Sequence, residues 1–285
     1  MLYNKEMKKR PPFYKKVAVV YNPEKERARA EWLKLRRWLQ GRRMVVVGGT
    51  RITAAMKQAD FVIAVGGDGT VLRVAREVAK WDIPVLGVNV GRLGFLADTE
   101  VGATHRALSR VLAGQGRVET RTLLSIRAVV NGKAAGPFLA LNDCVIRSGA
   151  TGRVLQLQAY VRQRLLARYV GDGLIVSTPT GSTAYNLAAS GPIVYPELDL
   201  LLLTPICPHT LAQRPLVLPS YEAISVEVGR PCPPALLCLD GIVNHTLSSG
   251  DRIEISRAAE QVQLLMDPDR HFYQVLQTKL KWGGA

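Results

Sequence analysis

The chain has 285 residues, of which 47% are hydrophobic and 21% charged, and its formal net charge is +15. This length and composition are typical of a globular protein with room for two domains, and they exclude a fibrous or disordered chain. The positive charge favours anionic ligands, but only 6% of the residues are aromatic and no zinc-finger, RNP-type or heptad pattern occurs, so nucleic acid is not an expected partner.

The sequence predicts neither a membrane anchor nor a secreted protein. No apolar run approaches the about 18 residues of a membrane-spanning helix. Residues 1–15 are basic and lack the apolar segment of a signal peptide, so we expect a flexible basic arm. Cys144, Cys207, Cys232 and Cys238 show no C-x-x-C pairing, which indicates reduced thiols and a cytoplasmic location.

The first part of the chain alternates strands with helices. Apolar, β-branched runs predict strands at residues 17–21, 44–47, 61–65 and 83–89, and helical spacing predicts helices at 24–40 and after the glycines near residue 67. This alternation indicates an α/β nucleotide-binding domain at residues 16–98 with a Rossmann-like parallel sheet. Ligands of such sheets bind at the carboxyl ends of the strands.

The stretch at residues 61–80, FVIAVGGDGTVLRVAREVAK, joins a buried strand to a helix through a glycine loop. Gly66, Gly67 and Gly69 let the backbone turn tightly and approach a ligand closely. Thr70 is expected to cap the helix. A glycine loop at a helix N-terminus binds anions, so these four residues form a predicted phosphate-binding loop.

Asp68 lies inside this loop and cannot itself hold a phosphate. A carboxylate in this place indicates chemistry at a hydroxyl group, a bound Mg²⁺ ion, or both. The loop lacks the lysine of a P-loop, and the dinucleotide pattern G-x-G-x-x-G meets Leu72 where a small residue belongs. Arg73 lies one turn into the helix and is a predicted phosphate contact. An ordinary strand–helix turn remains the alternative.

After residue 98 the pattern changes to short strands of period two. Strands are predicted at 124–130, 138–146 and 154–161, with further ones at 174–176, 216–218, 224–228, 236–239, 253–255 and 262–266. Asn131 and Gly132 form a hairpin turn. We therefore expect an all-β domain at residues 99–267. The amphipathic segment at 268–285 is predicted to form a helix that packs back on the first domain.

Two polar stretches stand out in this second part. Asn142 and Asp143 lie between apolar residues and need hydrogen-bond partners, which ribose hydroxyls or an exocyclic amine of a ligand would supply. Residues 171–192, GDGLIVSTPTGSTAYNLAASGP, predict a helix at 184–189 with Ser182 or Thr183 near its N-cap, and hence a second site for a polar or anionic ligand. No G-x-S-x-G elbow of a serine hydrolase occurs.

The stretches GGDGT, LNDCVI and DGLIVSTPTGSTAY, in this order, resemble the NAD kinase family. PICPHTLAQRPLVL, the pair Asp240 and Gly241, and FYQVLQTKLKW are similar to that family too. The resemblance implies transfer of a phosphoryl group to the 2′-hydroxyl of the adenosine ribose of NAD, which yields NADP. It implies Asp68 as the general base, Mg²⁺ as cofactor, ATP or polyphosphate as donor, and a homodimer or homotetramer.

The same resemblance implies a set of substrate-binding residues. Asn142 and Asp143 would bind ribose or adenine groups, Asp172 the nicotinamide end, and Tyr185 would stack on the adenine. The full set is Asp68, Gly69, Arg73, Phe95, Asn142, Asp143, Arg153, Asp172, Thr183, Ala184, Tyr185 and Ala188. From the sequence alone, Phe95 could offer a flat face to a base, but core packing is the commoner role of such a residue.

Three positions depart from the family pattern. Ala188 replaces a serine, Ser190 replaces a glycine, and Ile242 replaces a glutamine. These changes concern ligand contacts and not the class of reaction. Two other functions remain as alternatives: a lipid kinase of the diacylglycerol or sphingosine type, which shares GGDGT, and a non-catalytic nucleic-acid binder. Whether NADH also serves as acceptor is open.

Overall fold

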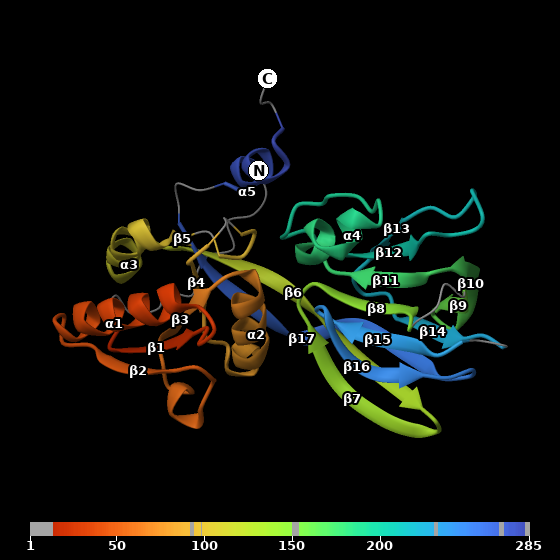
Figure 1. Ribbon diagram of the computed structural model, residues 1–285, viewed down its shortest axis with the longest axis horizontal. Helices are drawn as coiled ribbons and strands as arrows, with labels where there is room; N and C mark the ends of the chain where they lie inside the picture. Colours follow the sequence, from red (N-terminus) through yellow and green to blue (C-terminus); the bar gives the residue numbers. More distant parts are fainter. Residues whose placement is uncertain are drawn as a thin grey trace. The chain divides into compact units, whose positions relative to one another are not determined.

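The computed structural model describes residues 14–91, 94–97, 99–149, 154–230, 233–267 and 271–282. The chain forms two compact units, of which the first comprises Met1–Glu119 and Gln263–Ala285 and the second Thr120–Val262. Figure 1 shows the first in red to yellow with a blue C-terminal part. The division falls at Glu119, not at residue 98, because Leu108 and Val111 pack into the core of the first unit.

A parallel sheet forms the centre of the first unit. Its strands are β1 (Lys16–Tyr21), β2 (Val45–Gly49), β3 (Phe61–Gly66), β4 (Val85–Asn89), β5 (Thr99–Glu100) and the end of β17 (Arg252–Met266). The order is β17-β4-β3-β1-β2, and β5 pairs with β4. Strands buried on both faces read as continuous apolar runs, which is why the sequence predicted this α/β sheet correctly.

Helices cover both faces of this sheet. They are α1 (Glu26–Gln40), α2 (Asp68–Val78) and α3 (Thr104–Leu112), with 3₁₀ turns at Ala54–Met56, Ala79–Trp81 and Val101–Ala103. The C-terminal helix α5 (Phe272–Leu280) belongs to the same unit. Leu35 of α1 and Leu108 of α3 pack in one core with Ile63 and Leu86. Helix α2 packs on the other face. Gly87 of β4 lies under this helix, since a Cβ added to it would lie 3.0 Å from the Val71 side chain of α2.

The second unit consists of two antiparallel sheets with one core. The first sheet contains β6 (Arg117–Val130), β7 (Lys133–Ala140), β9 (Leu155–Val161), β10 (Arg164–Gly171), β14 (Ile224–Val228) and part of β17. The second contains β8 (Asp143–Ser148), β11 (Gly173–Ser177), β12 (Leu200–Ile206), β13 (Leu216–Pro219), β15 (Ala235–Leu239) and β16 (Ile242–Leu247). A 3₁₀ turn (Thr180–Thr183) and helix α4 (Tyr185–Ala188) follow β11. The predicted β domain is confirmed.

The local predictions for the second unit were right in part. The single strand expected at 138–146 is two strands, β7 and β8, which belong to different sheets. The helix expected at 184–189 is present as α4, a single turn at Tyr185–Ala188. Strands β10, β12 and β16 were not predicted, because their residues do not alternate in a way that separates a strand from other structure.

Cys144 and Cys238 are buried free thiols and Cys207 is an exposed one, while Cys232 lies outside the described residues. Burial raises the pKa of the Cys144 thiol well above its ordinary value, and the nearby Asp143 carboxylate adds to the effect. Within the described ranges, no helix is both long and apolar enough to span a membrane.

Candidate active site

The glycine loop after β3 leads directly into helix α2 and forms one wall of a pocket in the first unit. The helix begins at Asp68, with Gly67 as N-cap and no side-chain cap. Thr70 therefore does not cap the helix as predicted. Its side chain is buried under the loop, and a Cβ at Gly66 would come within 2.1 Å of Thr70 Oγ1, so only glycine fits there.

This pocket has a volume of about 790 Å³ and a polar lining that carries three cations and three carboxylates. The lining residues include Lys25, Thr50, Arg51, Asp68, Gly69 and Arg73. The ammonium of Lys25 lies over the loop, 3.3 Å from where a Cβ of Gly67 would be. Arg73 donates to the carbonyl of Thr50 at 3.1 Å and pairs with Glu77 at 3.6 Å, which holds its guanidinium at the wall. Cations beside a helix N-terminus suit phosphate groups.

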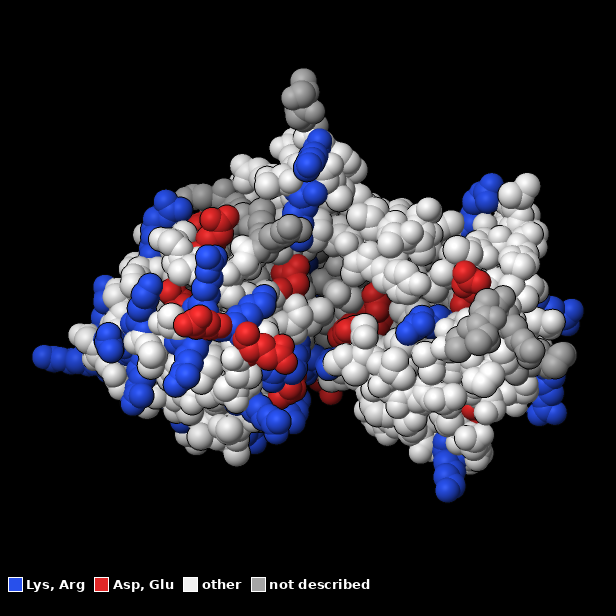
Figure 2. Space-filling view, viewed as in Figure 1, with Lys and Arg blue, Asp and Glu red and all other residues white. Residues whose placement is uncertain are grey.

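Lys and Arg side chains are also numerous on the outer surface of this unit. On the face drawn in Figure 2, blue side chains cover much of the first unit, with a few red ones between them. This distribution agrees with the net charge of +15 and places much of that charge on solvated side chains.

The carboxylate of Asp68 is held by three successive backbone N–H groups. Phe95 donates to Oδ2 at 2.8 Å, and Leu96 and Ala97 donate to Oδ1 at 3.1 and 3.0 Å. Gly94 allows this approach, since a Cβ there would lie 1.8 Å from Asp68 Oδ1. An ionised carboxylate offers about four acceptor positions, so room remains for one further hydrogen bond from a ligand hydroxyl.

Phe95 is half-buried, and its ring faces the C-terminal helix α5. The ammonium of Lys279 lies 4.9 Å from the centre of the ring. This cation–π contact joins α5 to the loop that holds Asp68, because the N–H of Phe95 is one of the three donors.

The second unit contains its own pocket, with a volume of about 270 Å³. Its lining includes Asn142, Asp143, Arg147, Ala184, Tyr185 and Asp240. Asp143 is only 3% exposed. Burial raises the pKa of Asp143 to about 7, and repulsion from the Asp240 carboxylate contributes. A carboxyl group with this pKa can donate or accept near neutral pH, which suits hydroxyl and amine groups of a nucleoside.

Asp240 holds the backbone of the Asn142–Asp143 loop. Its Oδ2 accepts from the N–H of Leu141 at 3.0 Å, and its Oδ1 accepts from Asn142 at 2.8 Å and Asp143 at 3.2 Å. The N–H of Asp240 donates in turn to the carbonyl of Asp143 at 3.0 Å. These bonds bend the chain where one strand was predicted, so that β7 ends before the loop and β8 begins after it.

The hydroxyls of the STPTGSTAY stretch turn inward. Ser177 Oγ donates to the carbonyl of Asn142 at 3.1 Å, and Thr178 Oγ1 donates to that of Leu141 at 2.6 Å. Ser182 Oγ contacts the backbone of Val194 at 3.3 Å. Helix α4 does follow this stretch, but its N-cap is Ala184 and no side chain caps it, so the cap predicted at Ser182 or Thr183 is wrong.

The structure brings the predicted site residues into two groups. Asp68, Gly69, Arg73, Gly67 and Thr70 line the first pocket, and Asn142, Asp143, Ala184 and Tyr185 line the second. Neither lining includes Gly66, Phe95, Asp172, Thr183 or Ala188. Arg153 lies outside the described residues. Sequence reasoning missed Lys25, Arg51, Arg147 and the role of Asp240. The available signal for Asp240 was a third Asp-Gly pair, after those at Asp68 and Asp172.

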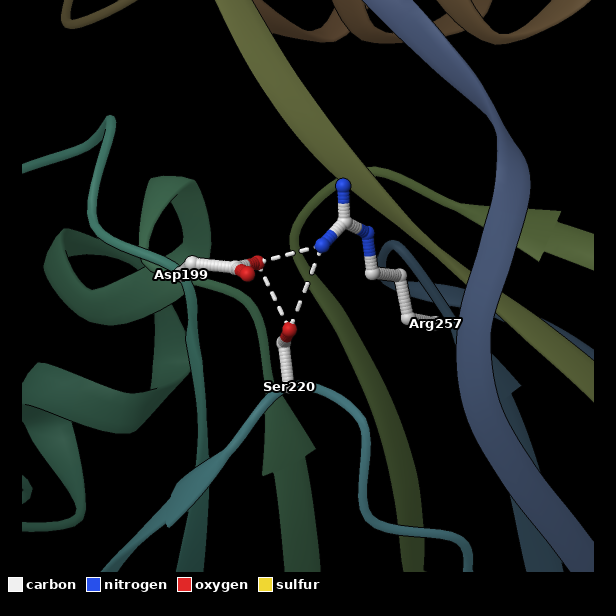
Figure 3. A network of polar contacts seen from close by, with 3 residues as sticks. All are labelled: Asp199, Ser220 and Arg257. Carbon is white, nitrogen blue, oxygen red and sulfur yellow. Dashed lines mark hydrogen bonds and ion pairs between the residues drawn. The ribbon is translucent and has the colours of Figure 1, made fainter.

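One further polar cluster lies apart from these two pockets. Figure 3 shows Ser220 and Arg257 converging on Asp199, whose Oδ1 accepts from Ser220 Oγ at 2.6 Å and from Arg257 Nη1 at 2.7 Å. Arginine has no acceptor and stays protonated, so it cannot activate the serine as a base. The cluster ties the start of β12 to the end of β13 and to β17.

A glycine loop at a helix N-terminus, cations around it and a firmly held carboxylate define an α/β protein equipped for phosphoryl transfer. The family model for the ATP-NAD kinase N-terminal domain matches residues 49–116, and that for the ATP-NAD kinase C-terminal domain matches residues 141–266. The chain belongs to the NAD kinase family.

Individual relatives agree with this assignment. The chain is 42% identical over 282 residues to the NAD kinase of Moorella thermoacetica, covering 95% of this chain and 90% of that protein. It is 43% identical over 227 residues to the NAD kinase of Geotalea daltonii, with 80% of each chain covered.

Solved structures share the fold. Yeast NADH kinase complexed with NADH superposes with a TM-score of 0.85 at 23% identity, covering 95% of this chain and 89% of that one. The NAD kinase from Archaeoglobus fulgidus in complex with ATP gives a TM-score of 0.78 at 24% identity, covering 93% and 98%.

Proposed function

We propose that this NAD kinase transfers the γ-phosphoryl group of ATP to the 2′-hydroxyl of the adenosine ribose of NAD, which gives NADP. The observation that carries the proposal is Asp68, a carboxylate at the first turn of α2, fixed by three N–H donors in a pocket that Lys25, Arg51 and Arg73 also line. The lipid-kinase alternative has no support, because both matching family models are those of ATP-NAD kinases.

Asp68 acts as the general base on the 2′-hydroxyl. The fourth acceptor position of its carboxylate takes the hydroxyl proton, and the three backbone donors keep the carboxylate from turning away. The glycine loop, Lys25 and Arg73 hold the donor phosphates and neutralise charge that moves during transfer. Polyphosphate, which carries the same phosphate chemistry, is a second donor to test.

The pocket of the second unit takes the nucleoside part of NAD. Asn142 and Asp143 bind ribose or adenine groups, and Tyr185, which is 40% exposed, offers a ring for stacking. For Arg153, Asp172, Thr183 and Ala188, only the resemblance to the family supports a substrate contact.

Mg²⁺ fits the first pocket as an ion that arrives with the nucleotide. Over the described ranges, no three His, Cys, Asp or Glu side chains gather into a metal cage. Mg²⁺ characteristically keeps several waters and binds through one or two carboxylates plus substrate phosphates, and Glu24 supplies a carboxylate in this pocket. The ion would neutralise phosphate charge.

We further propose a homodimer or homotetramer in the cytoplasm. Strand β16 ends its sheet, and Ile242 and Val243 on it are 55% and 51% exposed, so a second copy could cover them. Free thiols at Cys144, Cys207 and Cys238 suit a reducing compartment.

The test is an enzymatic assay with purified protein and Mg²⁺. NAD and NADH are offered as acceptors, ATP and polyphosphate as donors, and NADP or NADPH is quantified; diacylglycerol with ATP is the comparison for a lipid kinase. We expect NADP from NAD and ATP. Phosphorylation of diacylglycerol without any NADP would overturn the proposed function.

A further inference from the structure

The turn between β15 and β16 presents the side chain of Asp240 to the rest of the second unit. Asp240 and Gly241 have φ angles of +49° and +79°. Two successive left-handed residues are typical of a two-residue hairpin turn, where Asp followed by Gly is favoured. The sharp turn leaves the Asp240 carboxylate beside the loop that precedes β8.

The carboxylate replaces the strand partners that this loop lacks. Leu141 and Asn142 lie between β7 and β8, Asp143 is the first residue of β8, and the N–H groups of all three donate to Asp240. Leu141 and Asp143 are buried, so water is a poor substitute partner. One side chain therefore sets the backbone direction at three successive residues.

Two of these three residues line the pocket that we assign to the nucleoside. Asn142 and Asp143 lie on its wall together with Asp240 itself. The loop carbonyls are fixed from the opposite side, where Ser177 and Thr178 donate to Asn142 and Leu141. The loop is thus held through its donors by Asp240 and through its acceptors by the STPTGSTAY stretch.

We propose that Asp240 is a positioning residue for NAD: it fixes the backbone of residues 141–143 and thereby aims the side chains of Asn142 and Asp143 at the substrate. The inference rests on the proposed function and adds to it a residue that acts through others. It predicts that Asp240 governs the binding of NAD and leaves the phosphoryl donor unaffected.

The test compares Asp240→Asn with Asp251→Asn. Asp240→Asn keeps the shape of the side chain and removes its negative charge. It also places an NH₂ group, which cannot accept, where Oδ2 accepts from the N–H of Leu141. Asp251 is a matched control, because it is 5% exposed, lies in the same unit, and accepts from the N–H groups of Asn131 and Ser248 at 2.8 and 2.7 Å. We expect Asp240→Asn to raise KM for NAD about tenfold. KM for ATP should stay within about threefold in both variants.

A pH profile separates positioning from loss of stability. Since the Asp240 charge contributes to the raised pKa of Asp143, its removal lowers that pKa. In Asp240→Asn, the pH at which KM for NAD changes should move downward, and in Asp251→Asn it should stay in place. Equal KM values for NAD in the two variants, or an unmoved profile in Asp240→Asn, would overturn the proposal.

Calorimetric binding of NAD distinguishes this inference from the proposed function. A wild-type protein that binds NAD but forms no NADP refutes the function, and the Kd of Asp240→Asn then still decides the inference. A wild-type protein that does not bind NAD refutes both.

Discussion

The two units contain the same hydrogen-bonding arrangement in different electrostatic settings. Asp68 and Asp240 each precede a glycine, and each accepts three successive N–H groups from a loop distant in sequence. Asp68 starts a helix and shares its pocket with Lys25 and Arg73. Asp240 sits in a hairpin turn beside the buried acid Asp143. We call each arrangement, one aspartate that accepts three successive backbone N–H groups, a clamp. A clamp fixes a loop, and the surrounding charge decides what that loop can bind.

This contrast assigns different tasks to the two aspartates. In the first pocket, which has cations beside its carboxylates, a fixed carboxylate is free to act on a hydroxyl while the cations hold phosphates. In an acidic pocket, phosphate is repelled, and neutral donor groups of a nucleoside are favoured. Substitutions at the two clamps should accordingly affect different kinetic constants.

The largest effect is expected for Asp68→Asn. Loss of a general base typically lowers kcat about 10²–10⁴-fold. The amide also opposes the N–H of Phe95, so the melting temperature should fall moderately. Steady-state kinetics measures kcat, and thermal unfolding measures the melting temperature. Asp251→Asn is the control for the loss of an aspartate that accepts backbone hydrogen bonds. A kcat near that of the wild type would show that Asp68 is not the general base. Both aspartates would then serve only to fix a loop.

The hydrogen bonds that hold the Asp68 carboxylate can also be weakened without substituting Asp68 itself. Gly94→Ala puts a Cβ 1.8 Å from Asp68 Oδ1, so the carboxylate or the loop must move. A displacement of about 1 Å at a reacting group can cost 10²-fold in rate, and we expect kcat to fall by about that factor. Gly102→Ala is the matched control, because its Cβ would meet no atom within 4 Å. Unchanged kcat in Gly94→Ala would mean that the position of the carboxylate is not critical.

The acidic setting of the second clamp predicts a pH dependence of stability. In the folded protein the pKa of Asp143 is raised from 3.8 to about 7, so between these values the folded state keeps a proton that the unfolded chain loses. Stability from this group is fully present below the lower value and is lost as pH rises through about 7. The melting temperature of the wild type should therefore fall relative to Asp143→Asn between about pH 5 and about pH 8. Parallel curves would contradict the assigned pKa.

Much of the first clamp was predictable from the sequence, because it depends on local patterns. A buried strand, three glycines and an amphipathic helix follow one another within residues 61–80, and Asp68 lies among them. What the sequence did not reveal is that Thr70 is buried under Gly66, since that follows from the tight turn in three dimensions.

The second clamp was not predictable for the opposite reason. The bend at Asn142 depends on Asp240, which is 98 residues away. The apolar run at residues 138–146, with Asn142 and Asp143 inside it, has the pattern of one strand. Only the hydrogen bonds to the Asp240 carboxylate show that the chain bends there. The hydroxyls of Ser177, Thr178 and Ser182 likewise find their partners only after the sheets have packed, so the sequence did not reveal these hydrogen bonds.

The smallest effect is expected where the first clamp meets the C-terminal helix. Lys279 lies over the ring of Phe95, and the N–H of Phe95 donates to Asp68, so Lys279→Met weakens a support of the Asp68 carboxylate and leaves the carboxylate itself intact. An exposed cation–π contact is worth about 0.5–1 kcal/mol, which limits the loss in kcat/KM to about fivefold. Lys281→Met removes an equal charge near the end of the same helix and should leave kcat/KM unchanged. Equal losses in both variants would indicate that the helix acts through its net charge and not through Phe95.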